Sequence, residues 1–180
     1  MEIKKIKLNK RAVFGDFKVL KKKNFIDKRG VFSRTFCKNE FKKAGIKFEP
    51  KQINFSKNKL KGTIRGLHFQ DIKSKESKLV MCLKGKIFDV IVDIRKNSKT
   101  YLKSYSILLS DTNNLILYIP PGYAHGFQTM TNNVDILYLH NKFFNNKIYR
   151  TLNPLDKKID IKWPIKKKIL SKKDLNKKHL

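Results

Sequence analysis

The sequence predicts an all-β protein with the architecture of a jelly-roll-like barrel and a few short helices. Three observations lead to this prediction. Short apolar runs recur along residues 78–140 at close to the spacing of a β-sandwich or barrel. Turn signals rich in Gly, Pro, Asn and Asp separate these runs. Helical patterns are confined to one short segment early in the chain and another near the C-terminus.

The first strands are expected between residues 3 and 36, where short apolar runs are broken by lysines. Turn signals at residues 15–16 and 28–30 divide this region into two or three strands. A short helix follows, with Asn39 as its N-cap and Gly45 as its C-terminal stop.

The barrel strands follow a polar loop at residues 71–77. A strand over residues 78–83 ends at Lys84-Gly85-Lys86, which is a hairpin signal, and the next strand covers residues 87–94. Four more strands are expected, at residues 105–109, 115–119, 125–130 and 134–140.

The C-terminal tail is more polar than the rest of the chain. It carries the single Trp, Trp163, and Ser171 is expected to cap a last short helix. At 180 residues the chain can bury about two thirds of its unfolded surface and needs no disulfides for stability. We therefore expect one domain, residues 1–180.

The formal net charge of +29 raises nucleic acid or an anionic membrane as partners. The distribution of the charge argues against both. Arg accounts for only six of the 43 basic residues, and the lysines are scattered through every segment. We interpret them as a solvated surface that attracts anionic substrates and expect no nucleic-acid partner; a nucleic-acid binder is the alternative that charge alone would favour.

The two cysteines, Cys37 and Cys82, lie in apolar strand-like runs. They are expected to be buried free thiols in a reducing cytosol, and not a disulfide or a metal pair. No apolar window approaches the roughly 20 residues of a membrane-spanning helix. Because the N-terminus also lacks an apolar signal core, a cytoplasmic protein without a membrane partner is expected.

The stretch Gly62 to Gln70 carries the first candidate site residues, Arg65 and His68. In a regular strand these two side chains would lie on opposite faces. A bulge at Gly66 would turn both into one cavity. The alternative, a buried hydrogen-bonded histidine beside a surface arginine, fits this stretch alone equally well.

A second motif, Pro120 to Phe127, is a rigid turn that delivers His125 to the start of a strand. It has the form Pro-x-Gly-x-x-His of the second motif of cupin barrels. Metal-binding cupins carry two histidines separated by one residue in their first motif, where this chain has His68-Phe69-Gln70. Because the ligand pair is missing, neither a metal nor another cofactor is expected.

Six motifs occur in order: Arg65 to Gln70, Lys78 to Val80, Gly85 to Val90, Val92 to Arg95, Ile119 to Phe127 and Ile161 to Pro164. Together they closely resemble the dTDP-4-dehydrorhamnose 3,5-epimerase family, from about Asp27 to Asp174. The resemblance implies a cupin-type jelly-roll barrel and a metal-independent isomerase of deoxysugar and polysaccharide biosynthesis. Its substrate would be a nucleoside-diphosphate 4-keto-6-deoxy sugar, with dTDP-4-dehydro-6-deoxyglucose the best guess, inverted at carbon 3, carbon 5 or both.

Epimerisation beside a ketone needs a base, an acid on the opposite face of the sugar and a cation for the enolate oxygen. By the resemblance, His68 is the base, and Asp174 orients its ring and stabilises its charged form. Lys78 corresponds to the cation and Tyr138 to the acid. Without the resemblance, a buried hydrogen-bonded tyrosine, a surface aspartate and a surface lysine would be the favoured interpretations.

Other positions match family residues that contact the nucleotide diphosphate or the sugar. They are Arg29, Gln52, Asn54, Arg65, His125 and Phe144. Gln52 and Asn54 share one face of an alternating strand, which could also simply face solvent. Phe144 takes the place of a Tyr that stacks on the nucleobase, and any aromatic face preserves that stack. Some of these contacts cross a dimer interface in the family, which implies a homodimer.

Two positions depart from the family pattern. Arg34 stands where the family commonly has Glu, and a second Glu on the nucleotide side is replaced near Tyr149. The segment 151–156 resembles branches that act on other deoxysugars, so the nucleotide, the sugar and the product stay open. The alternatives are a 3- or 5-only epimerase, a non-catalytic sugar-binding cupin, and a 3,4-ketoisomerase, which Phe69-Gln70 in place of a further His disfavours.

Overall fold

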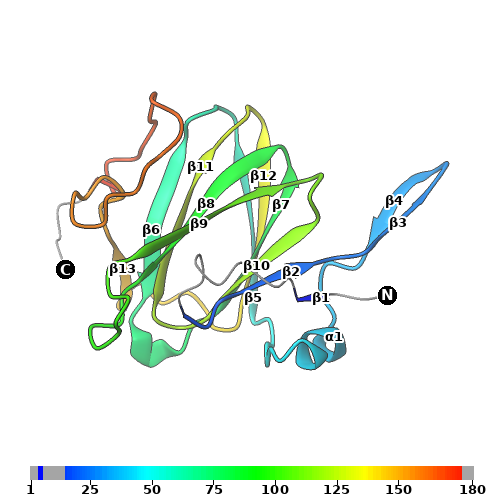
Figure 1. Ribbon diagram of the computed structural model, residues 1–180, viewed down its shortest axis with the longest axis horizontal. Coiled ribbons are helices and arrows are strands. Elements are labelled where there is room, and N and C mark those ends of the chain that lie inside the picture. The colour runs from blue at the N-terminus through cyan, green and yellow to red at the C-terminus, as the bar shows by residue number, and fades with distance from the viewer. Residues whose placement is uncertain (1–3, 6–14, 176–180) are drawn as a thin grey trace.

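Two antiparallel sheets face each other in the computed structural model, which describes residues 4–5 and 15–175 (Figure 1). The first sheet has the strand order β1 (Lys4–Lys5), β2 (Lys18–Lys21), β10 (Leu115–Ile119), β7 (Lys78–Lys84), β12 (Val134–His140) and β5 (Gln52–Asn58). The second has the order β13 (Tyr149–Thr151), β6 (Ile64–Gln70), β11 (Tyr123–Thr129), β8 (Lys86–Asp93) and β9 (Ser104–Ser110). The predicted all-β jelly-roll architecture is confirmed.

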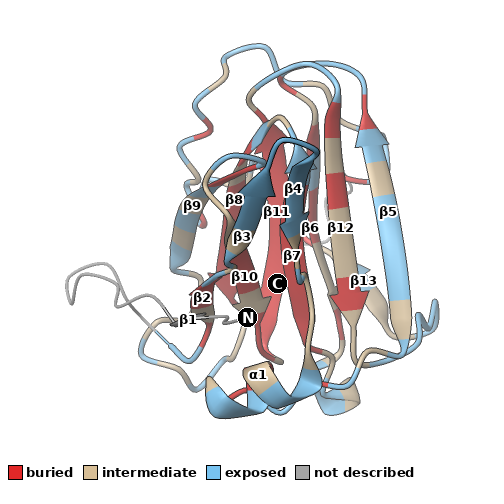
Figure 2. Ribbon diagram, turned by 90° about the vertical axis from the view of Figure 1, so that its right-hand side faces the viewer, coloured by how far each residue is buried: buried red, intermediate tan, exposed pale blue. Residues whose placement is uncertain are grey.

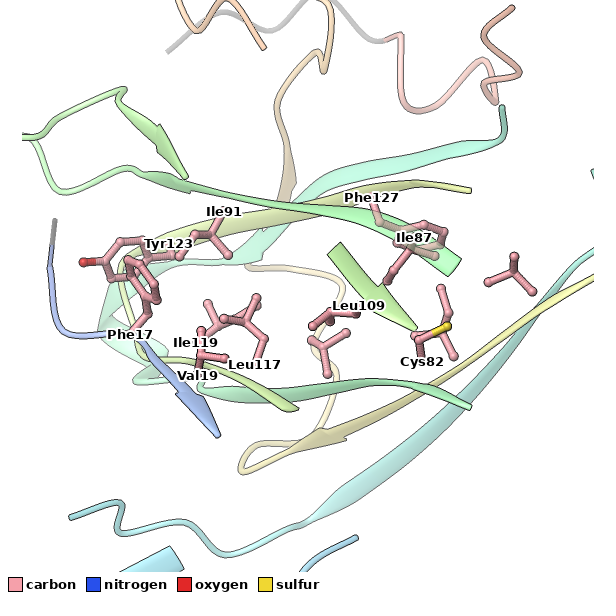
Figure 3. Packing of buried hydrophobic residues seen from close by; sticks show 13 residues of the cluster. Phe17, Val19, Cys82, Ile87, Ile91, Leu109, Leu117, Ile119, Tyr123 and Phe127 are labelled. Atoms are coloured by element: carbon pink, nitrogen blue, oxygen red, sulfur yellow. The ribbon is translucent and has the colours of Figure 1, made fainter. Parts of the chain in front are cut away.

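Alternating side chains of both sheets fill the space between them. Val80 and Cys82 of β7 belong to the same buried cluster as Ile87 and Ile91 of β8, on the opposite sheet (Figure 3). Phe127 of β11 belongs to this cluster as well. Each sheet thus supplies one wall of the core, because every second side chain along its strands points inward.

The outer face of each sheet is covered by a segment that lies outside the barrel. Helix α1 (Lys38–Lys43) places Phe41 against Leu79 and Met81, the outward-facing residues of β7. The C-terminal segment places Trp163 over the second sheet, where its Nε1 donates to the Pro154 carbonyl oxygen at 2.8 Å. Because these segments cover the outer faces, the apolar side chains there stay buried. Polar side chains can then occupy part of the barrel interior without leaving the protein short of buried apolar surface.

The helix begins earlier than predicted. Cys37, and not Asn39, occupies the N-cap position, and its carbonyl oxygen accepts the Phe41 N–H at 3.0 Å. Cys37 is only partly buried and precedes a helix instead of lying in a strand, whereas Cys82 is buried; both are free thiols. Gly45 follows the last helical turn with φ +73°, so the predicted stop is confirmed.

The turn at Gly85 is not a hairpin. β7 and β8 are both present, but they lie in different sheets: β7 pairs with β10 and β12, and β8 pairs with β9 and β11. Gly85 has φ +76°, which satisfies the tight turn that the sequence indicated. A local turn signal carries no information on which neighbours the two strands will pair with.

The expected helix near the C-terminus is absent from the described residues, where positions 172–175 form turns. Ser171 does act as a local cap, because its Oγ accepts the Asp174 N–H at 3.1 Å. It also donates to Asp174 Oδ2 at 2.9 Å, so the hydroxyl holds the aspartate side chain in place. A second short helix that was not predicted, the 3-10 helix η1 (Ile72–Ser74), lies in the polar loop before β7.

A two-stranded hairpin, β3 (Asn24–Asp27) and β4 (Gly30–Ser33), projects away from the barrel (Figure 1). With β1 and β2 it makes four short strands among the described N-terminal residues, where two or three were predicted. Figure 2 shows that this hairpin and the edge strand β5 are largely exposed. Four large apolar side chains of the hairpin are 41–77% exposed: Phe25, Ile26, Val31 and Phe32. None of the helices in the described part of the chain has the length and apolarity that a membrane span requires.

Candidate active site

A bulge in β6 brings Arg65 and His68 to the same side of the strand. His125 of β11 pairs with His68 and Phe127 pairs with Arg65, so β6 has one more residue than β11 between these pairs. Gly66 lies in the bulge with φ +130°, and a Cβ there would stand 2.5 Å from the Cα of Gly126. The close approach of the two backbones therefore requires glycine, and the predicted bulge is confirmed.

The bulge opens onto a cavity of about 290 Å³ between the two sheets. The structure brings eight of the sequence-predicted site residues to its walls: Gln52, Asn54, Arg65, His68, Lys78, His125, Tyr138 and Phe144. His68 and Tyr138 come from β6 and β12, which lie in opposite sheets. The strand that was predicted to be polar on one face, β5, does turn that face toward the cavity.

His68 forms a short pair with Asp174, 106 residues later in the chain. Its Nε2 lies 2.6 Å from Asp174 Oδ1, and the Asp174 side chain is only 7% exposed. Burial raises the pKa of Asp174, but the hydrogen bonds from His68 and Ser171 and the charge of Arg65 lower it by more, so the carboxyl group is ionised at neutral pH. The aspartate thus fixes the orientation of the imidazole ring.

Lys78 extends from β7 toward the backbone of β6. Its Nζ donates to the His68 carbonyl oxygen at 3.3 Å and lies 3.4 Å from Glu76 Oε2. The Lys78 side chain is about one tenth exposed. The Lys78 ammonium is therefore held beside the β6 backbone at His68, largely shielded from water, where it acts on a developing negative charge more strongly than in solution.

A second buried imidazole–carboxylate pair lies behind Tyr138. His125 Nε2 is 2.9 Å and 3.0 Å from the two carboxylate oxygens of Asp89, and both residues are buried. Burial raises the pKa of Asp89, and the neighbouring His125 opposes this shift only in part. The ring centroids of His125 and Tyr138 are 6.1 Å apart. Burial, followed by the negative charge of Asp89, raises the pKa of Tyr138, so its phenol keeps its proton at neutral pH.

Aromatic and amide groups form the open end of the cavity. The backbone N–H of Phe144 donates to Gln52 Oε1 at 2.8 Å, which anchors the segment after β12 to β5. The Phe144 ring packs edge-on against Tyr149, with centroids 5.2 Å apart, and 54% of the residue is exposed. An aromatic face is therefore available at the cavity mouth.

Arg29 is the predicted site residue that the structure does not bring to this cavity. It lies at the turn of the β3–β4 hairpin, where its Nη2 is 2.6 Å from Asp27 Oδ2, and its side chain is 88% exposed. Arg34, at a position that is usually acidic in the family, pairs with Glu40 at 2.6 Å. Neither arginine lines the cavity of this chain.

Three titratable residues of the cavity wall, Glu76, His140 and Tyr149, were not assigned a role from the sequence, and neither was Asp89, which pairs with His125. His140 could have been found, because it lies two residues after Tyr138 and shares its face of β12. Glu76 lies in a loop, where no periodicity predicts the direction of a side chain. Among the residues that the structure describes, no three His, Cys, Asp or Glu side chains gather as metal ligands would. The expectation of a metal-independent enzyme stays a prediction.

The sequence and the geometry can now be compared with those of known proteins. Residues 12–180 match the family model described as dTDP-4-dehydrorhamnose 3,5-epimerase. The chain belongs to the dTDP-4-dehydrorhamnose 3,5-epimerase family. It is 41% identical to the dTDP-4-dehydrorhamnose 3,5-epimerase from Shigella flexneri over 162 residues, and this aligned stretch covers 89% of each chain. The isomerase class and the epimerase activity expected from the motifs are confirmed.

Solved structures of the family share the fold. The epimerase from Bacillus anthracis, with TDP and PPi bound, aligns with a TM-score of 0.89 and 35% identity over 96% of each chain. The epimerase from Legionella pneumophila, in complex with dTDP-4-keto-L-rhamnose, aligns with a TM-score of 0.86 and 32% identity, over 96% of this chain and 90% of that chain. The cupin-type jelly roll is thereby confirmed, and family members bind dTDP-sugar ligands.

Proposed function

We propose that His68 and Tyr138 epimerise a dTDP-4-keto-6-deoxy sugar by working from opposite walls of the cavity. His68 removes the proton beside the ketone, and the electron pair of the broken C–H bond moves to the carbonyl oxygen as an enolate. Tyr138 then gives its phenolic proton to the opposite face of the same carbon, which inverts it. The observation that supports this proposal is that His68 and Tyr138 line the cavity from opposite sheets.

The activity is tested by incubating the protein with dTDP-4-keto-6-deoxyglucose in deuterated water. We expect deuterium at carbons 3 and 5 and formation of the inverted sugar, both followed by proton NMR. Exchange without inversion would remove Tyr138 as the acid, and the absence of both would contradict the proposed substrate.

Lys78 stabilises the enolate oxygen in this mechanism. The oxygen carries more negative charge in the enolate than in the ketone, so the attraction to Lys78 Nζ strengthens as the reaction proceeds. Lys78→Met is expected to lower kcat by about 100- to 1,000-fold, as removal of an oxyanion donor does, with little change in KM. Steady-state kinetics decide the matter: an unchanged kcat with a raised KM would make Lys78 a binding residue.

The nucleotide is bound outside the sugar cavity. At about 290 Å³ the cavity is at the lower end of the range for small-molecule sites, roughly 300–1,000 Å³, and so accommodates the sugar with the nucleotide at its mouth. Arg65 and His125 lie on the cavity wall, Gln52 and Asn54 offer amide groups, and Phe144 offers an aromatic face to the thymine ring.

The protein acts as a homodimer through the β3–β4 hairpin. The hairpin projects away from the barrel (Figure 1) and leaves four large apolar side chains exposed, as the cross-strand pairs Phe25–Phe32 and Ile26–Val31, which monomers rarely leave in water. A hairpin that packs on a second copy would carry Arg29 to that copy, where the guanidinium could meet the diphosphate of the nucleotide. This arrangement accounts for a binding residue that lies far from the cavity of its own chain.

Introducing negative charges into the hairpin is expected to dissociate the dimer. The double variant Ile26→Asp/Phe32→Asp places two carboxylates in the buried interface, and light scattering at micromolar concentration should then give the mass of one chain. Leu155→Asp, a charge at an exposed apolar residue outside the hairpin, is the control and should keep the mass of the dimer. A wild-type protein that is already monomeric and fully active would contradict the proposal.

A further inference from the structure

Glu76 is a buried carboxylate on the cavity wall that the proposed mechanism does not use. His140 Nδ1 donates to its Oε1 at 3.1 Å, and Gln70 Nε2 donates to the same oxygen at 3.0 Å. Its Oε2 lies 3.4 Å from Lys78 Nζ, and the Glu76 side chain is 8% exposed. Since Gln70 belongs to β6 and His140 to β12, the carboxylate is held from both sheets.

The charge state of Glu76 excludes a role in proton transfer. Burial raises its pKa, but the hydrogen bond from His140 and the charge of Lys78 lower it by more, to about 2. A carboxyl group with this pKa has no proton to donate near neutral pH, and the carboxylate is too weak a base to take one from carbon. Glu76 therefore contributes a permanent negative charge.

The backbone around Glu76 is fixed as well. Ser74 Oγ accepts the Glu76 N–H at 3.1 Å, and Asn141 Oδ1 accepts the N–H of Ser77 at 2.7 Å. Asn141 Nδ2 donates back to the Lys75 carbonyl oxygen at 3.2 Å. These bonds attach the loop before β7 to the residue that follows β12, so Glu76 meets Lys78 at a defined place.

Hydrogen bonds also lead from Glu76 to the mouth of the cavity. His140 continues the path, because its Nδ1 faces Glu76 and its Nε2 lies 3.4 Å from Asn54 Nδ2. Asn54 Oδ1 accepts from Gln52 Nε2 at 3.1 Å, and Gln52 Oε1 accepts the Phe144 N–H at 2.8 Å. A continuous path therefore joins Glu76 to the segment that carries Phe144.

We propose that Glu76 is a positioning residue that sets the place of the Lys78 ammonium and connects it to the segment of Phe144. A lysine side chain has many rotamers, and a buried ammonium is costly without a paired charge. Among the described residues, Glu76 is the carboxylate paired with Lys78, and the His68 carbonyl oxygen is the second partner. Together they hold the ammonium beside the base. The proposal rests on the proposed role of Lys78 in stabilising the enolate.

The first test is Glu76→Gln, which keeps the size of the side chain and an oxygen for His140 but removes the charge. We expect kcat to fall about 10-fold or more, with KM and the Kd for dTDP changed by less than about threefold. Glu76→Asp, which keeps the charge but shortens its reach, should also lose kcat. Glu49→Gln is the matched control, because Glu49 is exposed and pairs only with Lys38 among the described residues; it should keep the wild-type kcat.

The second test repeats Glu76→Gln in a Lys78→Met background. If Glu76 acts through Lys78, the double variant has the kcat of Lys78→Met to within about twofold, since the two effects are not independent. A further 10-fold loss in the double variant, or a wild-type kcat in both Glu76 variants, would overturn the proposal. If Lys78→Met itself keeps its kcat, the enolate-stabilising role fails and the positioning role fails with it, which is a distinct outcome.

Discussion

His68→Ala is expected to abolish both deuterium exchange at carbons 3 and 5 and inversion of the sugar. Asp174 orients the imidazole through a contact of 2.6 Å, so the substitution removes the base and leaves the rest of the pocket in place. General bases contribute about 100- to 10,000-fold, and we expect a loss within this range. Proton NMR in deuterated water measures both quantities at once.

The companion variant Asp174→Asn measures how much of the rate depends on the orientation of the base. It leaves the imidazole in place but replaces the carboxylate that orients the ring, so we expect a smaller loss than in His68→Ala. Exchange that persists undiminished in His68→Ala would show that another group removes the proton. The Kd for dTDP serves as the control in both variants and should stay close to that of the wild type.

Tyr138→Phe is expected to uncouple exchange from inversion. The base and Lys78 remain, so the proton can still leave and return through His68 on the same face of the sugar. Inversion needs a proton on the other face, and the partly buried phenol that supplies it is gone. We expect inversion to fall by about 100-fold or more while exchange with retained configuration persists. The ratio of the two rates in deuterated water is the measurement.

A second cavity tyrosine provides the comparison for this experiment. Tyr149 lies on β13 in the same sheet as His68, and the two ring centroids are 5.5 Å apart. It therefore approaches the sugar from the side of the base, and Tyr149→Phe should change the rates of exchange and inversion by the same factor. Equal loss of both rates in Tyr138→Phe would mean that Tyr138 positions the sugar and does not protonate it.

The parts of the site that follow from local backbone chemistry could be predicted from the sequence. Gly66 indicated a bulge because a glycine inside a strand serves little other purpose, and the bulge does bring Arg65 and His68 together. The alternation around Asn54 predicted a polar face but left open whether it faces solvent, and in the structure this face lines the cavity. The roles of Lys78, Tyr138 and Asp174 came from the family resemblance, since each residue alone has a common structural explanation.

The features that the sequence did not predict depend on contacts between distant residues. The partners of the strands on either side of Gly85 are set by the packing of two sheets, which a turn signal does not contain. The direction of Glu76 is set by His140 and Gln70, which lie 64 and 6 residues away in the chain. The N-cap at Cys37 uses the backbone carbonyl oxygen and no side-chain hydrogen bond, so no residue type marks it in the sequence.

The docking of the C-terminal segment on β6 separates substrate binding from the orientation of the base. Ile169 exchanges backbone hydrogen bonds with Gly62 and Ile64, at 3.0 and 2.8 Å, and this contact brings Asp174 beside His68. The cavity walls themselves end at β13, so the carboxylate that orients the base comes from a segment that lines none of the cavity. We expect loosening of this segment to slow turnover while the nucleotide sugar still binds, because binding uses the cavity walls and orientation of the base uses Asp174.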